Sequence, residues 1–146
     1  MLWGAANGGQ LELRRSEKGG VRLVGRFPYD TETTLAPGRA ERIAAGAFAA
    51  RIDAGEDIHL LSGHDYAKPL ASRAAGTLIL RNTAQALELE ATITPDMERA
   101  SWAQDFLSAQ AAGLIRGLSP GFVVAEGGEI VERSGDGLLR TITAAD

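Results

Sequence analysis

Two alternating runs joined by a short polar turn constrain this chain more than any other feature. "GTLILRN" and "ALELEATI" both have the length of a strand, and only "TAQ" separates them. In the second run, Glu88 and Glu90 alternate with apolar residues, so the two types of side chain face opposite sides. Runs this close together predict an antiparallel pair with one apolar and one polar face.

The rest of the chain is predicted to form further short elements separated by turns and loops. The polar stretch "TETTLAPGRAERI", which Pro37 and Gly38 interrupt, is predicted as a loop with a short extended end. A short helix is expected over 47–54, stopped by Gly55. Further strands are expected at 11–15, 21–27, 58–61 and 113–124, with a hairpin at the Gly19-Gly20 turn and another around 134–137.

One longer helix is expected between the paired strands and the stretch "GLIRGLSPGFVV". Thr94 can cap its first turn, and Pro95 suits the first helical position. Asp96 and Glu98 favour the positive end of the helix dipole, and Gly113 ends the helix.

Mostly short strands with one solid helix predict an α+β fold built on an antiparallel sheet or a small barrel, and not a doubly wound one. The chain has 146 residues, which suits one domain with a modest core. The glycine-rich residues 1–10 are expected to form a flexible arm, and 11–146 a single domain.

Composition excludes several classes of function. Lys and Arg number 15 against 19 Asp and Glu, and a net charge of −4 argues against a nucleic-acid binder. The chain has no cysteine, which rules out disulfides, thiolate metal sites and a cysteine nucleophile. No segment has the roughly 20 apolar residues of a membrane span, and the first residues do not resemble a signal peptide. An intracellular setting is expected.

Ser119 and His64 are the candidate catalytic pair. Ser119 lies between glycines in "GLIRGLSPGFVV", and His64 follows Gly63 in "SGHD". A histidine can activate a serine as a nucleophile, so the two side chains suggest a Ser–His dyad. The pattern alone favours the simpler interpretation, in which Ser119 is a small strand residue and His64 a surface turn residue.

Other polar residues fit simpler roles. His59 alternates with apolar neighbours and is expected as a packed or half-exposed strand residue. A metal site from His59, His64 and Asp65 ranks low, because ligands bunched at one strand end converge poorly. Glu88 and Glu90 could form a carboxylate pair of the glycosidase type, but their spacing is typical of a solvated strand face.

Four segments in order resemble a known family. "ERIAAGAFAARI", "HLLSGHDYAKPLASRAAGTLIL", "ALELEATI" and "GLIRGLSPGFVV" are similar to the motifs of the prohead (capsid-maturation) proteases of tailed phages, which also occur in prophages and gene transfer agents. The resemblance covers roughly 21–124. It implies a serine endopeptidase similar in fold to the herpesvirus assembly proteases, with a mainly antiparallel β-barrel and flanking helices.

The resemblance also assigns roles to residues and partners. It makes Ser119 the nucleophile and His64 the general base. Within the chain, Glu88 and Glu90 are the candidates to orient His64, with Glu90 preferred, and Asp65 is the alternative that is expected only to cap a turn. The implied substrates are the major capsid protein and scaffold segments, cleaved inside the assembling procapsid in the host cytoplasm, with self-processing as a further activity. No cofactor, metal, nucleic acid or membrane is implied, and the herpesvirus relatives allow a homo-oligomer.

Two departures from the family pattern bear on activity. Pro120 stands where the family has an aromatic or aliphatic residue, and without an N–H it cannot donate a hydrogen bond to an oxyanion. The family's last core strand is expected to follow "RTIT" but is not found before Asp146. The alternatives are therefore a non-catalytic protease-like module that binds scaffold or capsid subunits, and a small β-rich binding domain from an unrelated system.

Overall fold

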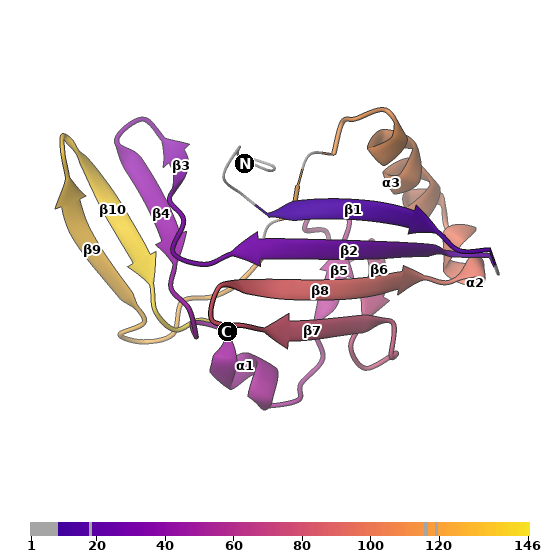
Figure 1. The fold of residues 1–146 in the computed structure, drawn as a ribbon, viewed down its shortest axis with the longest axis horizontal. Helices are drawn as coiled ribbons and strands as arrows, with labels where there is room; N and C mark the ends of the chain where they lie inside the picture. Colours follow the sequence, from indigo (N-terminus) through magenta and orange to yellow (C-terminus); the bar gives the residue numbers. More distant parts are fainter. Residues whose placement is uncertain (1–8, 18, 116, 119) are drawn as a thin grey trace.

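The computed structural model describes residues 9–17, 19–115, 117–118 and 120–146. The predicted arm falls mostly on 1–8, which lie outside the described residues, and the first strand already begins at Gln10. Figure 1 shows two sheets side by side and a smaller strand pair behind the first. In the described part of the chain no helix is long and apolar enough to cross a membrane.

The first sheet has the strand order β1-β2-β8-β7, and all its neighbours are antiparallel. It confirms both predicted strand pairs, the hairpin at Gly19-Gly20 and the pair formed by the two alternating runs. Its strands are β1 (Gln10–Arg15), β2 (Val21–Pro28), β7 (Leu78–Asn82) and β8 (Ala86–Ile93). As predicted, alternation separates an apolar inner face from an outer face that carries the charged residues.

The second sheet has the order β3-β4-β10-β9. The loop predicted over 31–43 is wrong, because Pro37 and Gly38 are the turn of a β3–β4 hairpin. The hairpin predicted around 134–137 is confirmed as β9–β10, and β10 also pairs with β4 in parallel. The strands are β3 (Thr33–Ala36), β4 (Arg39–Ile43), β9 (Glu129–Ser134) and β10 (Gly137–Ile142).

A third, two-stranded sheet pairs β5 (His59–Leu61) with β6 (Pro69–Ser72). β5 was expected, whereas β6 was not, since Pro69 and a run of only four residues give a weak strand signal. The strand predicted over 113–124 is not formed: the described residues there make only isolated bridges, at Leu118 and Val124.

The helices follow the predicted ends. They are α1 (Ala49–Asp53), α2 (Pro95–Glu98) and α3 (Ser101–Ala111). The Thr94 hydroxyl accepts from the Met97 N–H at 3.2 Å, which confirms the cap, and Gly113 has φ 73° just after the last turn. The long helix is divided, however, because Ala100 is extended, with ψ 140°.

The mainly β, α+β character is confirmed, while the described residues form no closed barrel. Two apolar cores fill the space behind the sheets. The larger one packs the inner face of the first sheet, including Leu23 and Ile93, against β5, β6 and α3. The smaller one joins Tyr29, Phe48 and Ile142 beneath the second sheet.

Ile93 tests the larger core. Its side chain is fully buried, so Ile93→Ala should lower the free energy of unfolding by about 2–5 kcal/mol. Ile79, on neighbouring β7, is 52% exposed on the outer face and provides a matched control, for which Ile79→Ala should change stability by about 0.5 kcal/mol or less. Urea unfolding of both variants measures the difference, and equal losses would contradict the assignment of faces.

Tyr29 makes stability sensitive to alkaline pH. Its hydroxyl donates to Asn82 Oδ1 at 2.5 Å, and burial raises its pKa to about 12. Tyrosine in the unfolded chain ionises near pH 10, so the folded state holds this proton longer. The stability that this group contributes is therefore fully present below about pH 10, and it is lost, by up to about 3 kcal/mol, as the pH rises toward 12.

Paired variants isolate that contribution. Tyr29→Phe should remove part of the decline in unfolding free energy between pH 9 and 12. Tyr66→Phe should leave it intact, because Tyr66 is 85% exposed. The same pH slope in wild type and Tyr29→Phe would show that Tyr29 is not responsible.

Candidate active site

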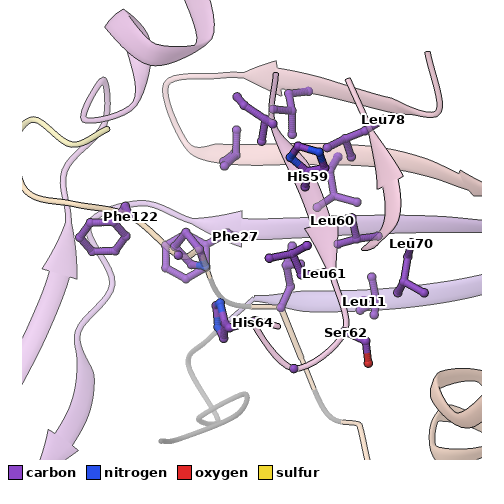
Figure 2. A pocket seen from close by; sticks show the side chains of 18 of the residues that line it. Leu11, Phe27, His59, Leu60, Leu61, Ser62, His64, Leu70, Leu78 and Phe122 are labelled. Carbon is purple, nitrogen blue, oxygen red and sulfur yellow. The ribbon is translucent and has the colours of Figure 1, made fainter. Parts of the chain in front are cut away.

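A cavity of about 860 Å³ lies between the first sheet and the segment on either side of position 119. Its floor is the inner face of the sheet, which contributes Leu11, Phe27, Leu80, Leu87 and Leu89. Its walls are β5, α1 and the described residues of 114–123. Figure 2 shows His59 near the start of β5 and His64 beyond its end, so the cavity runs along this strand.

His64 is held on the cavity wall by an unusual turn. Gly63 and His64 both have positive φ, 66° and 51°, and this region is unfavourable for a residue with a Cβ. The turn is closed by main-chain bonds from Ser62 N to Lys68 O at 3.0 Å and from Asp65 N to Ser62 O at 3.2 Å. Left-handed non-glycine residues are concentrated at functional sites, where the surrounding structure imposes the strain.

Gly121 lies against the imidazole of His64. A Cβ added at Gly121 would lie 3.1 Å from His64 Nδ1 and 3.5 Å from Cε1. The next residue, Phe122, packs edge-on against Phe48, with ring centroids 5.7 Å apart. Glycine therefore allows the main chain two positions after Ser119 to approach the histidine closely.

Leu118 is fixed on the other side of position 119. Its N–H and C=O pair with Gly9 at 3.0 and 3.1 Å. A Cβ added at Gly25 would lie 2.9 Å from Leu118 Cδ2, so the leucine packs onto β2 where that strand has no side chain. Ser119 itself lies outside the described residues, but both of its sequence neighbours, Leu118 and Pro120, line the cavity together with His64.

The chain after Gly121 is also paired. Val123 N donates to Asp146 O at 2.9 Å, and Asp146 N donates to Val123 O at 2.8 Å. Ala125 N donates to Ala144 O at 3.1 Å, so a short ladder continues from the cavity toward β10.

The expected third residue, Glu90, is not brought to His64. Glu90 lies on the outer face of β8, opposite to Leu87 and Leu89, which form the cavity floor. Its carboxylate forms ion pairs with Arg22 and, at 3.2 Å, with Arg81. Strand alternation separates Glu90 from the cavity and directs Glu88 to the same outer face.

Asp65, the alternative, forms a turn of its own. Its Oδ1 accepts from the Ala67 N–H at 2.9 Å, and Oδ2 lies 3.7 Å from Lys68 Nζ. These contacts match the expected turn cap. The structure does not support a metal site at His59, His64 and Asp65. Among the described residues, no three side chains of the metal-binding types lie close enough together to hold one ion.

Sequence reasoning missed an imidazole–carboxylate pair at the other end of β5. His59 Nε2 lies 3.3 Å from Asp57 Oδ2, and both residues line the cavity. Asp57 Oδ1 also accepts from the Ala74 N–H at 2.8 Å, which fixes the carboxylate. The sequence "DIH" could have indicated this pair. Asp57 and His59 are two residues apart, and residues i and i+2 of an extended segment face the same side.

The contact between Gly121 and His64 can be tested directly. Gly121→Ala places a methyl group 3.1 Å from Nδ1, so the imidazole must move by a few tenths of an ångström. We expect the His64 Cε1–H signal to shift in the NMR spectrum. His59, the only other histidine, is the internal control and should not shift. Unchanged signals from both rings would contradict the contact.

Comparison with known proteins now identifies the family. No curated protein and no solved structure matches the chain, so the expected likeness in fold to herpesvirus assembly proteases stays a prediction. A family model described as caudovirus prohead serine protease matches residues 4–146. That match spans the sheet, the turn that holds His64 and the segment that contains Ser119. The chain belongs to the caudovirus prohead serine protease family.

Proposed function

We propose that the chain is a serine endopeptidase of prohead maturation, with Ser119 as the nucleophile and His64 as the general base. The observation that carries this proposal is the close approach of Gly121 to the His64 imidazole. The residues fixed on each side of position 119 support it, because a nucleophile must be held within reach of its base.

The reaction would proceed by acyl transfer. The imidazole of His64 takes the proton of the Ser119 hydroxyl as Oγ bonds to the scissile carbonyl carbon. The imidazolium then gives this proton to the leaving nitrogen as the carbon–nitrogen bond breaks. A water molecule, deprotonated by the same imidazole, attacks the acyl-enzyme, and the proton returns to Oγ when the carbon–oxygen bond breaks.

The developing oxyanion needs N–H donors, and Pro120 cannot supply one. Gly121 carries the first main-chain N–H after Ser119, and its residue lies beside His64. We assign Gly121 as one oxyanion donor. The absence of a Cβ at this position leaves room for the substrate carbonyl to approach the N–H.

The family points to substrates of the capsid. The proposed substrates are the major capsid protein and its scaffold segments, cleaved within the assembling procapsid in the host cytoplasm, with self-processing as an additional reaction. The proposed chemistry uses only side-chain and main-chain groups and requires no cofactor.

One observation favours a second candidate, a non-catalytic module that binds scaffold or capsid subunits. Glu90, the residue expected to orient His64, is instead paired with Arg22 and Arg81. Such a module would bind the same substrates without cleaving them.

Replacement of the two proposed catalytic residues distinguishes these candidates. Ser119→Ala and His64→Gln should each reduce cleavage of the capsid protein by a factor on the order of 10³ or more, because nucleophile and base act as one unit. Binding of the intact substrate should survive. Cleavage is followed by gel electrophoresis and mass spectrometry, and binding by co-sedimentation.

Ser62→Ala is the matched control, because Ser62 is a second serine on the wall of the same cavity. It should retain cleavage close to that of the wild type. Loss of cleavage in Ser62→Ala but not in Ser119→Ala would overturn the assignment of the nucleophile. Binding without cleavage by the wild-type chain would support the non-catalytic module.

A further inference from the structure

We infer that the cavity beside His64 selects extended peptides with two large apolar side chains separated by one residue, close to the cleaved bond. This inference rests on the proposed function and adds the substrate class. It follows from three properties of the cavity: an apolar and aromatic lining, charges that are already paired, and a strand edge along its length that pairs with no other described strand.

The lining is apolar where the cavity meets the candidate catalytic residues. All four phenylalanines of the chain contribute to it. Phe122 follows Gly121 directly, and Phe27 lines the same cavity as His64 (Figure 2). A substrate side chain near the scissile bond would therefore meet aromatic and aliphatic groups, and its burial would contribute about 1.5–3 kcal/mol for a residue such as leucine or phenylalanine.

The charged groups of the lining are paired within the protein. Arg51 lies 3.8 Å from Asp146 Oδ1 and also pairs with Glu56. Asp57 pairs with His59 at 3.3 Å. A charged substrate side chain would have to displace one of these partners or remain unpaired in an apolar site, and both are costly. The lining thus favours an apolar side chain over Lys, Arg, Asp or Glu.

β5 offers a main-chain partner for an extended peptide. Among the described strands it pairs only with β6, so its other edge has no strand beside it. The cavity follows β5 from His59 to Leu61 and continues to His64. A peptide added along a strand edge gains main-chain hydrogen bonds, and the pockets beside it read alternate side chains.

The size of the cavity indicates how many side chains of the substrate it can hold. A volume of about 860 Å³ is near the upper end of ligand pockets, which span about 300–1,000 Å³. This space can hold more than one large side chain. In an extended peptide, residues i and i+2 face the same side, so two buried side chains require the pattern apolar–x–apolar.

Exposed apolar residues at the cavity also support an apolar peptide as its occupant. Tyr66, Leu114 and Val123 all line it and are 85%, 75% and 72% exposed. Val123 is two residues beyond Gly121, and Tyr66 is two residues beyond His64. These exposed apolar side chains therefore line the same cavity as His64 and the residues on either side of position 119.

Cleavage profiling tests the preference. The wild-type chain is incubated with a peptide library derived from a digested proteome, and the new ends are identified by mass spectrometry. We expect Leu, Ile, Met or Phe at two positions separated by one residue, within four residues of the cleaved bond. Replacing either apolar residue with Ala in a synthetic peptide should lower kcat/KM by about tenfold or more.

Peptide binding tests the cavity without cleavage. The Ser119→Ala chain is titrated against a fluorescent apolar–x–apolar peptide, and anisotropy gives Kd. Leu114→Ala in this background should weaken binding by about threefold or more, as expected for a partly exposed contact. Ile79→Ala is the matched control, because Ile79 is also an exposed apolar residue but lies on the outer face of β7, and it should leave Kd unchanged.

The outcomes separate this inference from the proposed function. Cleavage without an apolar preference overturns the inference and leaves the protease intact. Selective binding without cleavage by the wild type supports the apolar site and contradicts the protease. If Leu114→Ala changes the oligomeric state in sedimentation but not peptide affinity, a second copy of the chain covers this surface and the inference is wrong.

Discussion

The pairing of β2 with β8 is the constraint on which the rest of the structure depends. Eight residue pairs hold these strands in register, from Val21 opposite Ile93 to Pro28 opposite Ala86. A shift of one residue would turn the side chains of one strand to the opposite face of the sheet relative to those of its partner. The register therefore decides that Val21, Leu23 and Ile93 form the core at one end of the inner face, and that Phe27 and Leu87 form the cavity floor at the other. The position of the site is a consequence of this one alignment.

The second feature that organises the site is the absence of a side chain at two glycines, where other parts of the chain approach closely. Gly25 lets Leu118 rest directly on the sheet, and Gly121 lets the following segment reach His64. A Cβ at either position would obstruct the contact, which is why glycine suits both. The turn at His64 is also irregular: Gly63 and His64 have positive φ, and main-chain hydrogen bonds at Ser62 and Asp65 close the turn.

Much of the fold could be predicted from local patterns. The alternation of 86–93 predicted the faces of β8, and Thr94 and Gly113 predicted where the helical region starts and ends. The failures are long-range effects. Residues 33–43 form strands because β10 pairs with β4 across nearly 100 residues of sequence, which no local propensity reveals. The stretch 113–124 appears strand-like in sequence because it is largely apolar, but its described residues line the cavity and form isolated bridges.

The charge distribution shows why the site could be only partly predicted. The family motif predicts His64 as a site residue, and the structure adds that the main chain at Gly121 approaches its imidazole closely. Glu90 was preferred among the carboxylates as the group that orients His64, yet strand alternation argues against it. A residue that alternates with Leu87 and Leu89 must face away from the surface that they line. Carboxylates can reach this cavity only from segments outside the first sheet. Asp57, before β5, and Asp146, paired with Val123, meet that requirement and line the cavity. Any carboxylate that assists the chemistry from within the described residues must therefore come from such segments and not from β8.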